Sequence, residues 1–341
     1  MTLRLVPQPL GPHGGRSGCR IDLSASLNPL GPSQVALEAS RSCEVDRYPD
    51  PRAGPLVEAV AERHGVSEDR VVPLPGAAAG IWLCFLALAG QGDTALVVAP
   101  CFGEYERCAR MVGADSRRVW SWPPGSWPPP ALRTALEQRP RVCVLANPSN
   151  PGGSAVPSWQ LSALCGEHAA TTFLVDEAFA SFAPAGTSLL DGDLPDNVLV
   201  LRSLTKELGL PGLRMGYLVA GPRPASALRA LLPAWPISAP SLAAAVAGLG
   251  DLEHVRRGAE AARTTLGRLR RTLEAAGVPT FPSDANFLVA ESPVLPAALA
   301  IRGISVRDCT DFGLPGHFRA AAPRPPDLEQ VLAAVAEAGG G

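Results

Sequence analysis

The sequence has almost no lysine. Of its 30 lysine and arginine residues, only Lys206 is a lysine. Drift from lysine to arginine in a GC-rich genome explains the arginines, and one lysine can remain on a surface by chance. Arginine stays protonated in proteins, however, whereas a lysine amine can lose its proton and attack a carbonyl carbon. A lysine retained where a guanidinium cannot replace it points to Schiff-base chemistry at Lys206.

The sequence also lacks an excess of either charge and any long apolar run. The net charge is −2 and the isoelectric point is about 6.2, which argues against a nucleic-acid partner. No run of about 20 apolar residues could span a membrane, and residues 1–13 lack the apolar core of a signal peptide. We therefore expect a cytoplasmic protein that binds neither nucleic acid nor membrane.

Cysteine and histidine occur without metal-binding spacing. The eight cysteines form no CxxC pair and the five histidines form no HExxH motif, so we expect no metal site. Several cysteines lie in apolar runs, where a reduced thiol behaves as a small hydrophobic group. Free thiols are typical of the cytoplasm.

The sequence has the composition of a globular protein, with 46% hydrophobic and 18% charged residues. Short apolar runs predict strands over 94–99, 117–120, 142–146, 172–176, 198–201 and 215–220. Amphipathic stretches between them predict helices over 76–89, 104–112, 130–138 and 158–170. This alternation predicts an α/β fold, a large doubly wound domain over 46–250 with a mostly parallel sheet.

A smaller α+β domain is expected over 251–341. A helical pattern runs from 240 to 277, predicted strands follow over 286–290, 304–307 and 318–322, and a helix over 326–339 closes the chain. Residues 1–45 show little periodicity, and we expect this segment to pack on the smaller domain.

Three successive predicted strands end in polar residues. The strand over 142–146 runs into the segment NPSNPGG (147–153), the next ends in Asp176, and the third leads into the segment SLTK that contains Lys206. Taken singly, a carboxylate can cap a helix, and NPxN is ordinary turn chemistry. Open α/β sheets bind ligands at the carboxyl ends of their strands. The joint occurrence therefore predicts one site.

These motifs resemble those of the fold-type I pyridoxal-phosphate (PLP) enzymes, specifically the class I/II aminotransferase group. NPSNPGG is similar to that family's NPxNPTG, DEAF (176–179) to its DEAY or DEAF, and SLTK with GLRMG (212–216) to its SxSK…GxRxG. The resemblance covers nearly the whole chain. It implies that Lys206 forms the Schiff base with PLP, that Asp176 pairs with the pyridine nitrogen, and that Asn150 bonds the phenolic oxygen.

The resemblance also implies residues at the cofactor's ring and phosphate. Phe102 is similar to the aromatic residue that stacks on the pyridine ring, and a core phenylalanine is the alternative. Tyr48, in RYPDP, is similar to a tyrosine donated across a dimer to the neighbouring phosphate, which implies a homodimer with shared active sites. The family usually has an acidic or hydroxyl residue where this chain has two alanines. The implied phosphate contacts are Gly76, Ala77, Ala78, Ser203, Thr205 and Arg214.

Substrate contacts select the reaction. Arg319 is similar to the arginine that binds a substrate α-carboxylate, and a structural salt bridge is the alternative. The opening HGG…DLSASLNPLG and the segment ISVRDC…FGLP resemble threonine-phosphate decarboxylases of cobalamin biosynthesis, which implies His13, Asn28 and Arg307 near a substrate phosphate. Phe179, where most aminotransferases have tyrosine, favours the same reading. We therefore expect decarboxylation of a small phosphorylated amino acid, threonine phosphate or serine phosphate.

Transamination is the alternative, because histidinol-phosphate aminotransferases share the YPDP and substrate-phosphate features. In decarboxylation, Arg319 and the phosphate site orient the Cα–carboxylate bond perpendicular to the cofactor ring, whereas in transamination Lys206 removes the Cα proton. A dehydrogenase would require GxGxxG after a strand, and none occurs. A PLP-responsive transcription regulator would require a DNA-binding module ahead of the fold, and we expect none before Asp22.

Overall fold

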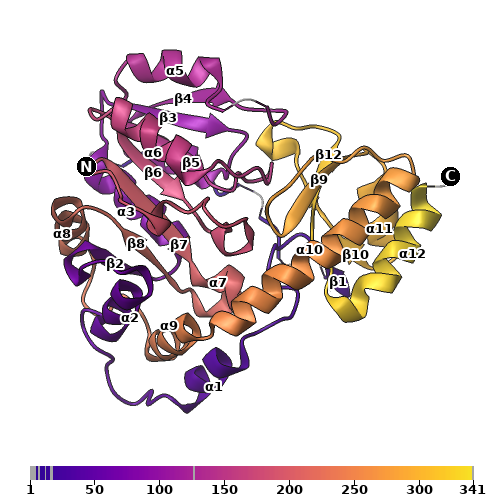
Figure 1. Ribbon diagram of the computed structural model, residues 1–341, viewed down its shortest axis with the longest axis horizontal. Coiled ribbons are helices and arrows are strands. Elements are labelled where there is room, and N and C mark those ends of the chain that lie inside the picture. The colour runs from indigo at the N-terminus through magenta and orange to yellow at the C-terminus, as the bar shows by residue number, and fades with distance from the viewer. Residues whose placement is uncertain (1–4, 7, 12, 16–17, 126, 340–341) are drawn as a thin grey trace.

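A seven-stranded sheet forms the centre of the larger part of the molecule (Figure 1). This computed structural model describes residues 5–6, 8–11, 13–15, 18–125 and 127–339. The strands of the sheet are β2 (Val71–Leu74), β3 (Thr94–Ala99), β4 (Asp115–Trp120), β5 (Val142–Ala146), β6 (Thr172–Asp176), β7 (Val198–Ser203) and β8 (Gly216–Val219).

The order of the strands is β2-β8-β7-β6-β5-β3-β4. All neighbours from β4 to β7 are parallel, and only β8 runs antiparallel to its neighbours β7 and β2. The strands β3, β5, β6 and β7 are almost completely buried, as their near-continuous aliphatic sequences require, whereas the edge strand β4 is mostly exposed. The predicted α/β fold with a mostly parallel sheet is confirmed.

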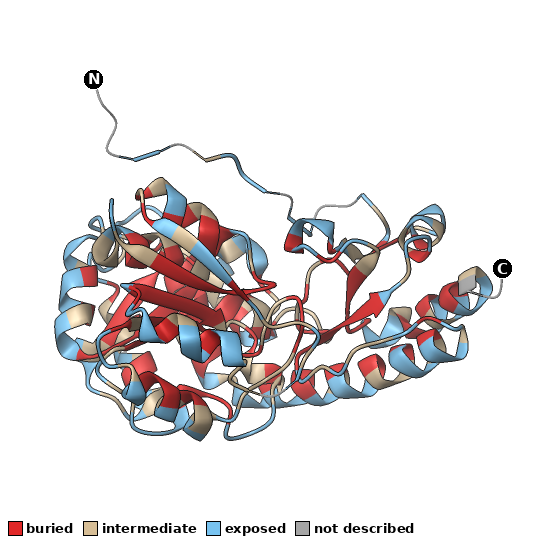
Figure 2. Ribbon diagram, turned by 90° about the horizontal axis from the view of Figure 1, so that it is seen from above, coloured by how far each residue is buried: buried red, intermediate tan, exposed pale blue. Residues whose placement is uncertain are grey.

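Helices cover both faces of this sheet, and their inner sides are buried (Figure 2). One face is covered by α3 (Ala77–Leu88), α4 (Glu104–Met111) and α8 (Pro222–Ala230). The other face is covered by α2 (Gly54–His64), α5 (Pro130–Glu137), α6 (Ser158–Glu167) and α9 (Ala239–Gly250). These two layers make the domain doubly wound.

The smaller part contains a three-stranded antiparallel sheet that is covered by helices. The strands β11 (Arg307–Asp308), β12 (His317–Ala321) and β9 (Phe287–Glu291) pair in that order. A core of its own lies between this sheet and α10 (Leu252–Ala275), α11 (Leu295–Ile301) and α12 (Leu328–Gly339).

Two predicted helices end earlier than their sequence pattern indicates. The pattern over 240–277 is divided between α9 and α10 at Asp251, whose carboxylate accepts the N–H of His254 at 3.3 Å and so caps α10. The helix predicted over 158–170 ends at Glu167. There the Asn197 side chain donates to the carbonyl oxygens of Cys165 and His168, at 2.8 and 3.3 Å, and provides hydrogen bonds that a further helical turn would otherwise make.

The N-terminal segment contacts both parts of the molecule. Its strand β1 (Ile21–Asp22) pairs in parallel with β10 (Ile304–Ser305) of the smaller part. Its helix α1 (Gln34–Ser42), however, packs on α9 of the larger part. Positions 1–4, 7, 12 and 16–17 of the predicted 1–45 segment lie outside the described residues. The limits 1–45, 46–250 and 251–341 stay predictions.

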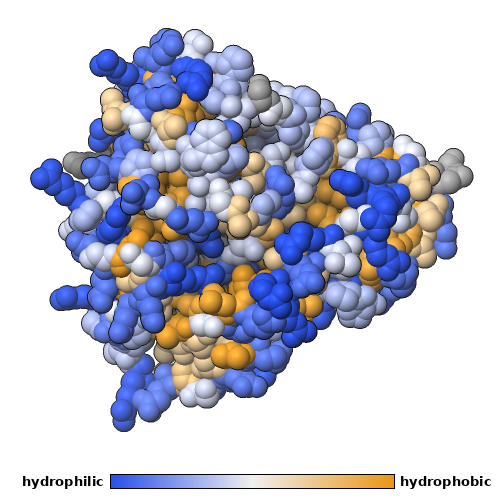
Figure 3. All heavy atoms as spheres, in the orientation of Figure 1, coloured by the Kyte–Doolittle hydropathy of each residue, from blue (hydrophilic) through white to orange (hydrophobic). Residues whose placement is uncertain are grey.

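Within the described ranges, no helix combines the length and apolarity that crossing a membrane requires. The same residues contain no group of three or more histidine, cysteine, aspartate or glutamate side chains suited to a metal ion. Apolar side chains on the face shown in Figure 3 gather in separate patches among hydrophilic ones, which is ordinary for a folded protein.

Candidate active site

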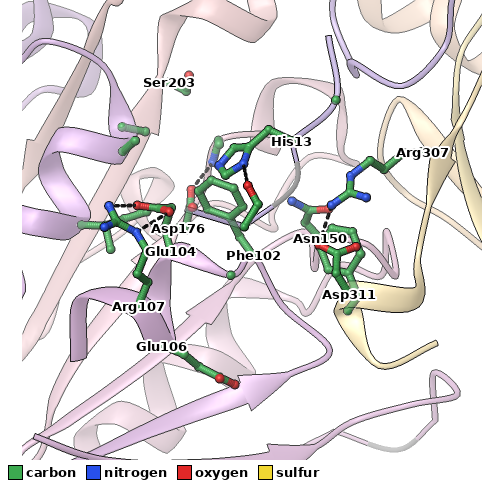
Figure 4. Close-up of a pocket in the computed structure, with 18 of the residues that line it drawn as sticks. His13, Phe102, Glu104, Glu106, Arg107, Asn150, Asp176, Ser203, Arg307 and Asp311 are labelled. Atoms are coloured by element: carbon green, nitrogen blue, oxygen red, sulfur yellow. Dashed lines mark hydrogen bonds and ion pairs between the residues drawn. The ribbon is translucent and has the colours of Figure 1, made fainter. Parts of the chain in front are cut away.

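A cavity of about 410 Å³ lies at the carboxyl ends of β5, β6 and β7 (Figure 4). The register places Asp176 of β6 beside Ala146 of β5 and Leu201 of β7, so the polar residues that end these strands meet at one edge. The predicted site residues that line this cavity are His13, Ala77, Ala78, Phe102, Asn150, Asp176, Ser203, Thr205, Lys206, Arg214, Arg307 and Arg319.

Lys206 lies in the short helix α7 (Leu204–Glu207), directly after β7. Burial, with the positive charges of Arg319 and Arg214 as smaller causes, lowers the pKa of its amine to about 8, and Asp176 acts in the opposite direction. The amine nitrogen lies 5.8 Å from the centre of the Phe179 ring. An amine with this pKa is substantially neutral near pH 8, as a nucleophile must be.

Asp176 is held by two hydrogen bonds. Its Oδ2 accepts the Tyr105 hydroxyl at 2.6 Å, and its Oδ1 accepts the backbone N–H of Ala178 at 2.9 Å. Burial raises the pKa of the carboxyl, while these donors and the charge of Lys206 oppose the rise. No motif in the sequence indicates the contact of Tyr105 with this carboxylate. Tyr105 lies fully buried in α4, three residues after Phe102, and no local pattern shows which buried tyrosine faces the carboxylate.

Donors for an anion converge at one end of the cavity. Gly76 has φ of 89°, and a Cβ there would lie 2.7 Å from a guanidinium nitrogen of Arg214, so glycine alone leaves room for this approach. The Ser203 and Thr205 hydroxyls lie 2.8 Å apart. The first turn of α3 starts directly after Gly76 and presents its backbone N–H groups, since the N-cap Gly76 has no side chain to accept from them. This donor set fits the phosphate of PLP.

Arg319 of β12 is buried and lines the same cavity. One Nη atom donates to Asn150 Oδ1, and the other donates to the carbonyl oxygen of Ser24 at 2.9 Å. Its buried Nε finds no acceptor among the described residues. Burial lowers the pKa of the guanidinium to about 10, so it stays charged at neutral pH. A buried cation with an unused donor is suited to an anionic substrate group.

Two further predicted substrate contacts, Arg307 and His13, line the same cavity. Arg307 forms an ion pair with Asp311 at 2.6 Å, and its guanidinium lies 4.9 Å from the centre of the Phe312 ring. The His13 ring meets Phe102 edge to face, with centroids 5.7 Å apart. Figure 4 shows His13 and Arg307 reaching the cavity from different segments of the chain.

Two predicted site residues lie elsewhere. Tyr48 is 81% exposed and stacks on Trp235 with ring centroids 4.5 Å apart, outside the cavity. Asn28 is buried and does not line the cavity either. Its Nδ2 donates to the carbonyl oxygen of Glu207 at 2.8 Å, and its backbone N–H donates to the carbonyl oxygen of Lys206 at 3.0 Å. These bonds hold the Asn28 amide at the α7 turn, and its expected contact with a substrate phosphate stays a prediction.

The family model for class I and II aminotransferases matches residues 20–335. The chain belongs to the class I and II aminotransferase family. It is 31% identical over 329 residues to histidinol-phosphate aminotransferase 1 of Archaeoglobus fulgidus, which covers 93% of this chain and 98% of that protein.

Solved structures of this family share the fold. The histidinol-phosphate aminotransferase of Sinorhizobium meliloti, in complex with pyridoxal-5'-phosphate, superimposes with a TM-score of 0.85 at 21% identity, over 94% of this chain and 91% of that one. The L-threonine-O-3-phosphate decarboxylase of Porphyromonas gingivalis gives a TM-score of 0.78 at 23% identity, over 92% and 98%.

Family membership confirms the predicted aminotransferase resemblance, the fold-type I fold and PLP as the cofactor. Family membership is a broader assignment than the decarboxylase activity that the sequence predicts. The similar curated relative carries the histidinol-phosphate name, whereas the decarboxylase shares the fold at an identity that says nothing of substrate. The comparisons therefore favour the alternative reaction over the expected decarboxylation.

Proposed function

We propose that this member of the aminotransferase family transfers the amino group of a phosphorylated substrate of the histidinol-phosphate type. The observation that carries the proposal is the presence of Arg307 and Arg319 in the same cavity as Lys206. Two guanidinium groups in addition to the cofactor-phosphate donors suit a substrate that brings its own phosphate. The identity to histidinol-phosphate aminotransferase 1 of Archaeoglobus fulgidus supports the same reading.

Each cavity residue has a role in this reaction that its surroundings support. PLP, when bound, supplies the electron sink for amino-group chemistry. Asp176 provides a buried negative charge that stabilises a protonated pyridine nitrogen. The Lys206 amine, with its lowered pKa, would accept the proton that leaves the substrate carbon next to the nitrogen and would deliver it to the cofactor carbon. Asn150 accepts from Arg319 through Oδ1, which leaves its Nδ2 to donate to the cofactor's phenolic oxygen.

A second candidate is decarboxylation of threonine phosphate or serine phosphate, in the pathway expected from the sequence, cobalamin biosynthesis. The observation that favours it is His13, which reaches the cavity against Phe102 from the HGG opening. In that case Arg319 holds the substrate carboxylate while Arg307 and His13 hold the phosphate. The same cations serve both reactions, so the substrate itself must distinguish them.

We also propose a cytoplasmic homodimer in which Tyr48 reaches the neighbouring active site. Tyr48 and Trp235 form a stacked, largely exposed aromatic pair. Two exposed aromatic rings in one patch are typical of a protein–protein contact. Sedimentation of the Tyr48→Ser variant tests this, because a weakened dimer is expected and an unchanged dimer with unchanged PLP affinity contradicts it.

The deciding experiment mixes the purified enzyme separately with histidinol phosphate, O-phosphothreonine and O-phosphoserine. Transamination predicts that histidinol phosphate converts bound PLP to the pyridoxamine form and that a 2-keto acid restores it. Carbon dioxide release from a phosphoamino acid with the cofactor unchanged would establish the second candidate instead. The Lys206→Ala variant is the control, because it should lose the absorbance of the covalently bound cofactor and turn over none of the three.

A further inference from the structure

Ser24 is a buried residue that follows β1 and lines the cavity. Its hydroxyl donates to Asp22 Oδ1 at 2.6 Å and accepts the backbone N–H of Gly15 at 2.8 Å. The same Asp22 oxygen accepts the hydroxyl of Ser305, on β10, at 2.9 Å. One side chain thus joins the N-terminal segment at Gly15 to the edge of the smaller part.

The backbone of Ser24 makes a second connection. Its carbonyl oxygen accepts a guanidinium N–H of Arg319 at 2.9 Å, in buried surroundings. Arg319 has few other partners there, since its Nε finds no acceptor among the described residues. The position of the Ser24 backbone therefore helps to set the direction of the Arg319 guanidinium.

The N-terminal segment touches Ser24 at unusually close range. A Cβ at Gly14 would lie 2.5 Å from the Ser24 carbonyl oxygen and 2.9 Å from its hydroxyl oxygen, so any other residue would push the segment away. His13 comes immediately before Gly14 and reaches Phe102 in the cavity. The two glycines of the HGG opening thereby allow the His13 segment to lie against Ser24.

We propose that Ser24 is a positioning residue that couples the His13 segment to Arg319. Its hydroxyl holds the segment over the cavity and its carbonyl oxygen holds the guanidinium. A substrate anion that engages Arg319 therefore also stabilises the segment in its position against Ser24. This inference rests on the proposed function only in that Arg319 and His13 act on an anionic substrate.

The first test is amide hydrogen exchange of the PLP-bound enzyme, followed in the peptide that contains Gly14 and Gly15. Loss of one hydrogen bond in Ser24→Ala should speed exchange of this peptide by about 5-fold, while peptides of β5 to β7 stay unchanged. Inorganic phosphate should slow this exchange in the unsubstituted enzyme and have no such effect in Ser24→Ala. Equal exchange in the two proteins overturns the inference.

The second test separates KM from kcat with histidinol phosphate. Ser24→Ala and Gly14→Ala should each raise KM by roughly 5- to 10-fold, with kcat and the absorbance of bound PLP nearly unchanged. Ser24→Thr, which keeps the hydroxyl, should restore KM. Gly90→Ala is the matched control, because nothing lies within 4 Å of a Cβ at that position.

Either of two kinetic results contradicts the coupling. One is an unchanged KM, and the other is a parallel loss of kcat and cofactor absorbance, which would mean general disruption of the site. A failure of the proposed function is a different result: the unsubstituted enzyme would not turn over histidinol phosphate. The exchange experiment then still decides the role of Ser24, because it needs no turnover.

Discussion

Replacing Tyr105 by phenylalanine should weaken PLP binding without disturbing the packing of α4. The change removes only the hydroxyl that donates to Asp176 Oδ2 at 2.6 Å, and both side chains are buried. A short hydrogen bond to a buried carboxylate contributes about 2 kcal/mol. The donor stabilises the ionised carboxylate, so its loss raises the pKa of Asp176 further.

The ionised carboxylate is the form that stabilises a protonated pyridine nitrogen. A penalty of about 2 kcal/mol corresponds to a roughly 30-fold higher dissociation constant for PLP. Titration of the cofactor-free Tyr105→Phe enzyme with PLP, followed by absorbance, measures this constant directly. Because the carboxylate is easier to protonate in the variant, the affinity should also fall more steeply as the pH is lowered.

Tyr217→Phe is the matched control for this experiment. Tyr217 is an equally buried tyrosine, and its hydroxyl hydrogen-bonds His64 Nε2 at 2.7 Å, away from Asp176. Burial lowers the pKa of His64 to about 3, so the ring is neutral and the bond is an uncharged one. We expect this variant to lose about 1 kcal/mol of stability and to keep its PLP affinity. If Tyr105→Phe binds PLP as tightly as Tyr217→Phe does, the assigned role of Tyr105 is refuted.

Three further outcomes are expected. Burial lowers the pKa of Lys206 to about 8. The rate at which the cofactor-free enzyme captures PLP should therefore rise with pH and level off above that value. A rate profile whose midpoint lies near the ordinary lysine pKa would contradict this. Arg202→Met leaves the carboxylate of Glu177 buried without its ion-pair partner, so the free energy of unfolding measured in urea should fall by about 3–5 kcal/mol. Adding Glu177→Gln should recover part of this loss, and strictly additive losses would disprove the pairing. Arg319→Lys keeps the charge but cannot reach both Asn150 and the Ser24 carbonyl oxygen. KM for the anionic substrate should therefore rise roughly 10-fold. An effect confined to kcat would contradict the binding role.

The sequence predicts the strand-end residues of the site well for a physical reason. Parallel strands bring their carboxyl ends to one edge, and the register aligns Asp176 with the neighbouring ends of β5 and β7. Asn150 and Lys206 follow those two strands within a few residues. A reader of the sequence therefore needs only the strand pattern to infer that the amide, the carboxylate and the amine meet.

Contacts between distant segments are not predictable in this way. Tyr105 and Asp176 are 71 residues apart, and the helical pattern of α4 shows that Tyr105 is buried but not what its hydroxyl meets. Asn28 is a similar case. An amide can bind a substrate phosphate or a backbone carbonyl with the same chemistry. Only the folded chain shows that Glu207 lies within reach.

This difference explains why the family follows from the sequence more readily than the reaction does. The groups proposed to hold PLP lie on adjacent strand ends of one sheet, which local patterns reveal. The groups proposed to hold the substrate come from opposite ends of the chain, with His13 in the N-terminal segment and Arg307 and Arg319 on strands of the smaller part. The direction of these side chains depends on contacts such as that of Arg319 with the Ser24 backbone. Whether the substrate loses its carboxylate or a proton therefore depends on contacts between distant segments. Substitutions at those contacts should change substrate preference at a point where PLP binding is still unaffected.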